Sequence, residues 1–189
     1  MEIAQKRWDS IAKPLHSLGK LETLLIQIAG ITGSAEIDLS KRGLVAMCAD
    51  NGVVEEGVTQ TGQEVTAIVA ENLLRYDTSV GVMCRQNHAE IFPVDMGMVT
   101  DTKVRTDHKV AYGTKNMTKG PAMTREQAVK GIEAGIAMVE ELKEKGYRIL
   151  ATGEMGIGNT TTSSAVASVL LKQSVESMTG RGAGLTSEG

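Results

Sequence analysis

Gly43-Leu44-Val45-Ala46-Met47-Cys48-Ala49 is a continuous apolar run that leads directly into Asp50-Asn51-Gly52. A short, continuous apolar run that stops at a turn sequence is typical of a strand buried on both faces. Such a strand belongs to a parallel sheet with helices on each side, because that architecture covers both of its surfaces. The sequence therefore predicts an α/β fold.

Two later stretches repeat this pattern of an apolar run that ends near a glycine. They are Ile91-Phe92-Pro93-Val94-Asp95 before Gly97 and Tyr147-Arg148-Ile149-Leu150-Ala151 before Gly153. Between the predicted strands, the spacing of apolar residues predicts helices over residues 64–74, 80–85 and 124–143, the last beginning with the capping-box pattern Thr124-Arg125-Glu126-Gln127. This alternation predicts a mostly parallel sheet with helices on both faces, in which ligands gather at the carboxyl ends of the strands.

Two regions lie outside this alternation. From Glu2 to Ile31, apolar residues recur at mostly helical spacing with an interruption at Pro14, which predicts two helices ahead of the sheet. Residues 100–120 are polar and carry several lysine and arginine residues with no clean period. We expect this second region to form a long loop.

Composition excludes several classes of protein. Aromatic residues make up only 3% of the 189 residues, the net charge is −3, and there is no long run of basic residues. A nucleic-acid surface needs clustered positive charge or stacking rings, so we expect no nucleic-acid partner. No apolar run is long enough for a membrane span, and the N-terminus lacks a signal-peptide pattern, so we expect a cytoplasmic protein with no membrane partner.

Cysteine and histidine usage suggests no metal chemistry. Cys48 and Cys84 lie far apart in apolar surroundings, which favours buried, reduced thiols over a disulfide. His16, His88 and His108 are scattered without the spacing of metal ligands. We expect no metal site.

The sharpest local signal is Thr152-Gly153-Glu154-Met155-Gly156-Ile157-Gly158-Asn159-Thr160-Thr161-Thr162, which follows a predicted strand and leads into an apolar run. Glycines let the backbone approach a phosphate closely, and the N–H groups and dipole at the start of a helix favour an anion there. The alternative is a tight structural turn without a ligand. Glu154 lies inside this predicted loop, either as a solvated carboxylate or as a partner for a sugar hydroxyl or a cationic ring.

A second polar cluster follows the first predicted strand, from Asp50 to Thr66. Asp50 lies at the carboxyl end of that strand, the favoured place for ligand-binding residues, and the glycines that follow would permit a mobile loop. A turn with solvated carboxylates is the alternative. Asp95 has the same strand-end position in the second predicted strand.

Several blocks of sequence, taken together and in order, resemble the nicotinate-nucleotide:dimethylbenzimidazole phosphoribosyltransferase family. The blocks are Lys13-Pro14-Leu15-His16-Ser17-Leu18-Gly19-Lys20-Leu21-Glu22, Ala49-Asp50-Asn51-Gly52-Val53-Val54, Gly57-Val58-Thr59 with Gln63-Glu64-Val65-Thr66, Gly113-Thr114-Lys115-Asn116, Pro121-Ala122-Met123-Thr124, Gly153-Glu154-Met155-Gly156-Ile157-Gly158-Asn159-Thr160-Thr161 and Thr179-Gly180-Arg181-Gly182. The resemblance covers the whole chain.

This resemblance implies an activity and an architecture. It implies transfer of phosphoribose from nicotinate mononucleotide to 5,6-dimethylbenzimidazole, which gives α-ribazole phosphate and nicotinate for the lower ligand of cobalamin, without a cofactor or metal. It also implies a homodimer with a Rossmann-like large domain and a small helical domain built from both chain ends. Residues 1–32 would then belong to the small domain, and residues 33–189 to the α/β nucleotide-binding domain.

The resemblance also implies roles for individual residues. Gly156, Ile157, Gly158, Asn159 and Thr160 would cradle the nucleotide phosphate. Glu154 would lie near the ribose or the leaving base, and Asp50 would be a further substrate-binding residue. The loop that includes Thr59, Gln63 and Thr66 would line the benzimidazole pocket, although it departs from the aromatic and proline-containing form of many family members.

The chain also departs from the family in length. Family members continue well past Gly189, and the resemblance places the general-base glutamate in that part. We therefore expect a C-terminally truncated fragment with an incomplete large domain and impaired catalysis. Two alternatives stay open, namely a non-catalytic domain that binds a nucleotide or phosphate, and a module that serves assembly alone.

Overall fold

The computed structural model describes residues 1–183 and 186, so the end of the predicted large domain, residues 184–185 and 187–189, lies outside the described residues. The chain divides into two compact units, Met1–Lys41 and Arg42–Gly189. The division falls at Lys41, later in the chain than the boundary predicted after residue 32. Each unit is described separately below.

The first unit contains the two predicted helices, α1 (Glu2–Asp9) and α2 (Lys20–Thr32). The connection between them is fastened by Glu22, which is buried and whose Oε1 lies 2.9 Å from Lys13 Nζ and accepts a hydrogen bond from Leu18 N at 3.1 Å. The hydrogen bond from Lys13 lowers the pKa of Glu22, while burial opposes the shift. This ion pair holds a segment that has no strand or long helix of its own.

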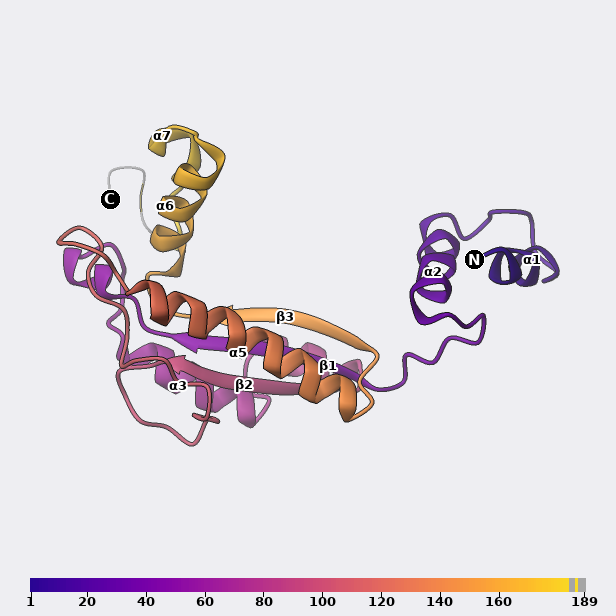
Figure 1. The fold of residues 1–189 in the computed structure, drawn as a ribbon, viewed down its shortest axis with the longest axis horizontal. Coiled ribbons are helices and arrows are strands. Elements are labelled where there is room, and N and C mark those ends of the chain that lie inside the picture. Colours follow the sequence, from indigo (N-terminus) through magenta and orange to yellow (C-terminus); the bar gives the residue numbers. More distant parts are fainter. Residues whose placement is uncertain (184–185, 187–189) are drawn as a thin grey trace. The chain divides into compact units, whose positions relative to one another are not determined.

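The second unit is built on a parallel sheet of β1 (Arg42–Ala49), β2 (Ala89–Gly97) and β3 (Ile149–Met155) in the order β2-β1-β3 (Figure 1). Its helical elements are η1 (Gly52–Glu56), α3 (Glu64–Leu74), α4 (Ser79–Gln86), α5 (Arg125–Glu144), α6 (Asn159–Leu171) and α7 (Val175–Met178). The predicted parallel α/β arrangement is confirmed. Within the described residues, no strand pairs with the outer edge of β3.

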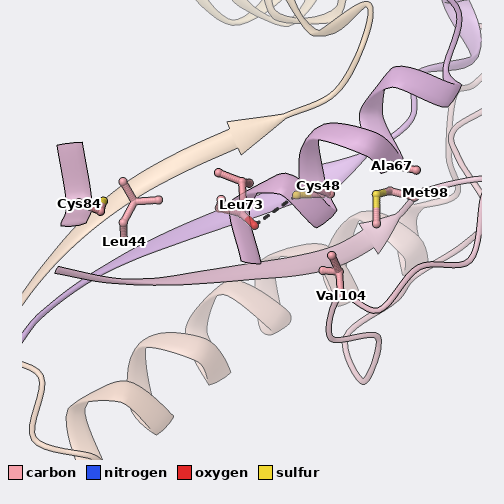
Figure 2. Packing of buried hydrophobic residues seen from close by; sticks show 9 residues of the cluster. Leu44, Cys48, Ala67, Leu73, Cys84, Met98 and Val104 are labelled. Carbon is pink, nitrogen blue, oxygen red and sulfur yellow. Dashed lines mark hydrogen bonds between the residues drawn. The ribbon is translucent and has the colours of Figure 1, made fainter. Parts of the chain in front are cut away.

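Helices cover both faces of the sheet because side chains alternate along β1. Leu44, Ala46 and Cys48 point toward one face and pack with buried residues of α3 and α4, among them Leu73. Figure 2 shows this cluster, in which Cys48 Sγ donates to the carbonyl of Ala46 at 3.6 Å. Val45 points the other way and packs against residues of α5. The covering of both faces, predicted from the apolar run, is confirmed for β1. It does not extend to β3, in which no residue is fully buried.

The two cysteines are buried free thiols, as predicted. Burial raises the pKa of the Cys48 thiol to about 12, and the nearby carboxylate of Asp95 adds to the shift. A thiol with such a pKa stays protonated near neutral pH and is a poor nucleophile. Cys48 is therefore part of the core and not of a reactive site.

The predicted end of the third strand is wrong. The sequence predicts that Gly153 terminates that strand and that Glu154 lies in a loop, but β3 continues to Met155. Gly153 pairs with Ala46 and Glu154 with Met47, so the ladder with β1 passes through the glycine. A neighbouring strand on one side is enough to hold a glycine in extended backbone, which local sequence alone does not favour.

The predicted long loop is present and lies against β2. Val94 forms an isolated parallel bridge with Arg105, and the N–H of Val110 donates to Met96 O at 2.9 Å. Lys109 Nζ lies 3.0 Å from the buried Asp95 Oδ2 and 3.7 Å from the centre of the Tyr112 ring. Burial alone would lower the pKa of Lys109, but the hydrogen bond and charge of Asp95 raise it above the usual value.

The predicted capping box at the start of α5 is also confirmed. Thr124 Oγ1 accepts from Gln127 N at 3.2 Å, and Gln127 Oε1 accepts from Thr124 N at 2.9 Å. Among the described helices, none is both long enough and apolar enough to cross a membrane.

Replacing Met138, which is wholly buried between α5 and the sheet, tests this packing. We expect Met138→Ala to lower the free energy of unfolding by about 2–5 kcal/mol, because it removes buried methylene groups and leaves a cavity. Ile132→Ala on the same helix is the matched control, since Ile132 is 67% exposed and its loss should change stability by about 0.5 kcal/mol or less. Urea unfolding measures both values. Equal values for the two variants would contradict the assignment of Met138 to the core.

Candidate functional site

The candidate site lies where the strand order changes direction. From β1 the chain moves to β2 on one side, and it later returns to β3 on the other side of β1. In open parallel sheets, ligands bind at the carboxyl ends of the strands at such a switch point. The segments at this place are the one that follows β1, residues 50–66, and the one that follows β3, residues 156–162.

The glycine-rich turn after β3 needs its glycines for two different reasons. A Cβ at Gly156 would lie 2.3 Å from the carbonyl oxygen of Ala49, so only glycine allows the close approach to the end of β1. Gly158 has φ +86° and caps the N-terminus of α6, a conformation that favours glycine. The turn is closed by a hydrogen bond from Asn159 N to Gly156 O at 3.0 Å.

The first turn of α6 offers backbone donors. Within residues 1–183 and 186, no acceptor is recorded for the N–H groups of Thr160 and Thr161, and no side chain caps this helix. Thr160 is exposed and Thr161 is partly exposed. Free N–H groups together with the helix dipole favour a bound anion at this position. Such an arrangement has the donors and the dipole direction to bind an anion.

Glu154 lies next to this helix start. Its Oε2 accepts a hydrogen bond from Asn159 Nδ2 at 2.6 Å. Although the residue as a whole is exposed, partial enclosure of the carboxyl raises the pKa of Glu154, and the hydrogen bond from Asn159 opposes that rise. A carboxylate that is both accessible and held in place can accept a hydrogen bond from a ligand hydroxyl.

The 59–66 segment, in which residues 64–66 form the first turn of α3 and not the predicted loop, is joined to both strand ends. Gln63 Nε2 donates to the carbonyl of Asn51 at 3.1 Å, and Thr66 Oγ1, which is wholly buried, accepts from Ile157 N at 3.1 Å. Thr59 is partly exposed, and its hydroxyl donates to Thr61 O at 2.7 Å within the loop. The structure therefore brings Gln63 and Thr66 close to the glycine-rich turn, while Thr59 lies further along the loop.

Asp50 is placed in the interior. Its side chain is wholly buried, and Oδ2 accepts from Val99 N at 2.8 Å, while its backbone bonds to Gly97 O and Thr114 N. Asp95 is also wholly buried, and its Oδ1 accepts from Met98 N at 2.7 Å. Both carboxylates hold the chain that follows β2, and neither is open to solvent.

Two features of this region escaped sequence reasoning. The first is the set of contacts made by Asn51, whose side chain reaches Ile157 and Thr162. The second is Asn116, which donates to Glu55 and Glu56 and so ties η1 to the long loop. No local pattern could have shown these contacts, because the partners lie between 60 and 111 residues apart.

The carboxylates of Glu55 and Glu56, which Asn116 contacts, are also paired with other groups. The hydrogen bond from Lys119, at 2.9 Å, and that from Asn116 lower the pKa of Glu55, and hydrogen bonds from Asn116 and Thr118 lower the pKa of Glu56. Both carboxylates therefore remain ionised at neutral pH. They serve to anchor the loop.

An apolar cavity of about 410 Å³ lies nearby, at the carboxyl ends of β1 and β2 and against the first half of α5. Its lining includes Met96, Val110, Met123 and Ile132. Within residues 1–183 and 186, no group of three or more His, Cys, Asp or Glu side chains is arranged to hold a metal ion.

Comparison with known proteins assigns this chain to a family. A family model described as phosphoribosyltransferase matches residues 1–189. Curated relatives named nicotinate-nucleotide–dimethylbenzimidazole phosphoribosyltransferase include one from Clostridium tetani, 49% identical over 193 residues, and one from Ruminiclostridium cellulolyticum, 51% identical over 191 residues. Both alignments cover 100% of this chain but only 53% and 54% of the relatives.

Solved structures agree with the sequence comparison. A crystal structure of CobT from Thermus thermophilus superimposes with a TM-score of 0.88 at 35% identity, covering 98% of this chain and 56% of that one. The whole of this chain is therefore matched, but it spans only about half the length of these relatives. It belongs to the nicotinate-nucleotide–dimethylbenzimidazole phosphoribosyltransferase family, also known as the CobT family.

Proposed function

We propose that this chain carries the nucleotide-binding half of an enzyme that transfers phosphoribose from nicotinate mononucleotide to 5,6-dimethylbenzimidazole. The products are α-ribazole phosphate and nicotinate, and the working form is a homodimer with a small helical domain that includes residues 1–32. Family membership supports the reaction. The observation that carries it to named residues is the glycine-rich turn at the β1/β3 switch point, with free N–H groups at the start of α6.

The proposed roles follow the geometry. The nucleotide phosphate lies against residues 156–160 and accepts hydrogen bonds from the N–H groups of Thr160 and Thr161 and from the hydroxyl of Thr160. Glu154 accepts a hydrogen bond from a ribose hydroxyl or steers the positively charged nicotinate ring. Gln63, Thr66 and Thr59 hold the segment that lines the benzimidazole pocket, and Asp50 supports the site from within.

The chemistry is a displacement at the anomeric carbon of the ribose. A benzimidazole nitrogen forms the new bond from one face while the bond to nicotinate breaks on the other, and nicotinate leaves with the bonding electrons. A carboxylate accepts the proton on the second ring nitrogen as the new bond forms. We propose that this general base lies in the part of the relatives that this chain does not span, so that Glu154 is a binding residue.

Turnover tests this proposal directly. Incubated with nicotinate mononucleotide and dimethylbenzimidazole, the Clostridium tetani relative should release nicotinate, and the 189-residue chain should release it more slowly by more than about 10²–10⁴-fold, the usual contribution of a general base. Chromatographic measurement of free nicotinate gives both rates. Comparable rates would show that a carboxylate within residues 1–189 serves as the base, with Glu154 the first candidate.

Calorimetry separates the remaining alternatives for the chain itself. A nucleotide-binding half should bind nicotinate mononucleotide with measurable heat, and a module that serves assembly alone should bind neither the nucleotide nor the base. Absence of binding would therefore remove the proposed role of this chain, whatever its relatives do.

Two substitutions test the phosphate turn. Gly158→Val should weaken binding of nicotinate mononucleotide at least about tenfold, because a Cβ there would lie 2.9 Å from Val54 and the residue has φ +86°. Asn159→Ala, which imposes no backbone strain, should weaken it less by freeing Glu154. The matched control is Gly135→Val in α5, where a Cβ meets nothing within 4 Å. Wild-type affinity in folded Gly158→Val and Asn159→Ala would rule the turn out as the phosphate site.

A further inference from the structure

Asn51 connects three segments that are far apart in sequence. Its Nδ2 donates to Ile157 O at 3.0 Å, and its Oδ1 accepts from Thr162 Oγ1 at 3.3 Å. Its backbone carbonyl accepts from Gln63 Nε2 at 3.1 Å. One residue just after β1 therefore contacts the glycine-rich turn, the first turn of α6 and Gln63 at the start of α3.

The peptide groups of Ile157 are held from two sides. Its carbonyl accepts from Asn51 and its N–H donates to the buried hydroxyl of Thr66. With both groups engaged, Ile157 cannot rotate to present its own N–H to a ligand. The donors that remain for an anion are those at the start of α6, whose direction depends on where Ile157 is fixed.

An amide is the side chain that this position requires. It must donate to the carbonyl of Ile157, which Asn does and an ionised Asp does not, because the carboxylate has no proton to donate. The single hydroxyl proton of Thr162 is shared between Asn51 Oδ1 at 3.3 Å and the nearer Asn159 O at 2.9 Å. A Cβ at Gly156 would also lie 2.9 Å from Asn51 Nδ2, so the amide packs directly on the turn that it supports. Removing it leaves the carbonyl of Ile157 without its partner in a partly buried place.

We propose that Asn51 is a positioning residue that holds the glycine-rich turn and the 59–66 segment in a single arrangement, so that the nucleotide and the base are presented to each other at a fixed geometry. This rests on the proposed function for the identity of the two ligands. The connection between the glycine-rich turn and the 59–66 segment does not depend on the proposed function, because the hydrogen bonds themselves define it.

Amide hydrogen exchange tests the connection made by Asn51 without any ligand. In the 189-residue chain, Asn51→Ala should speed exchange of the Ile157 N–H at least about tenfold, because the turn loses the contact that keeps this N–H on Thr66. Asn51→Asp should do the same at neutral pH, and the exchange rate relative to wild type should recover as the pH falls toward about 4, where the protonated acid regains a donor. Recovery with pH would not occur if Asn51 merely filled space.

Nucleotide binding tests the consequence for function. Asn51→Ala should weaken binding of nicotinate mononucleotide about tenfold by calorimetry, the effect of one lost and partly buried hydrogen bond. The matched control is Asn87→Ala, since Asn87 Nδ2 donates to Met83 O at 2.9 Å at the end of α4, away from the turn. This control should keep wild-type affinity and wild-type exchange at Ile157.

The two measurements fail separately. A folded Asn51→Ala variant with wild-type exchange at Ile157 would overturn the positioning role. If exchange rises in that variant but nucleotide affinity stays unchanged, Asn51 does hold the turn, and the proposal that this presents the ligands to each other is wrong. If the wild-type chain binds no nicotinate mononucleotide, the proposed function fails, and the exchange experiment alone decides the positioning role.

Discussion

Strand β1 holds the other elements of the second unit in place. It is paired along both edges and covered on both faces, so its carboxyl end has little freedom to move. The two residues that follow it serve opposite sides. Asp50 bonds to Gly97, Val99 and Thr114 on the side of β2, and Asn51 bonds to the turn after β3. The ends of all three strands are thereby related through two consecutive residues.

The sequence alone predicts the elements that leave a local pattern of apolar or capping residues. The apolar run at residues 43–49 was enough for a doubly covered parallel strand, and Thr124 with Gln127 was enough for the start of α5. The assignment failed at Gly153, where a glycine suggested an end to the strand. The sheet overrode that preference, since pairing with β1 supplies hydrogen bonds that local sequence does not reveal.

In the candidate site too, features with a local sequence pattern can be predicted, and contacts between distant residues cannot. The glycine-rich turn was found because glycines near a helix start leave a visible pattern, and the structure explains Gly156 by the approach of Ala49 and Gly158 by its φ angle. The role of Asn51 was hidden, because its bond to Ile157 spans 106 residues. The burial of Asp50 was hidden for a similar reason, as a strand-end carboxylate can face either solvent or the long loop.

Both units use one enclosed ion pair to hold a segment that has little secondary structure. Lys13 with Glu22 fixes the connection before α2, and Lys109 with Asp95 fixes the long loop against β2. Enclosing two charges gains little net stability, but removing one partner leaves the other charge uncompensated. Such pairs therefore specify where a loop lies more than how tightly the domain folds. Within each pair, the two residues therefore constrain one another.

The outer edge of β3 has a consequence for the behaviour of the chain in solution. Its sequence, Ile149-Leu150-Ala151-Thr152-Gly153-Glu154-Met155, contains no proline or lysine, the residues that commonly protect an open edge, and its one charge lies near the carboxyl end. Backbone donors and acceptors along such an edge accept any extended segment of suitable length, with little regard to its sequence. Self-association through this edge would rise with protein concentration and would be greatest during refolding, when extended segments are abundant.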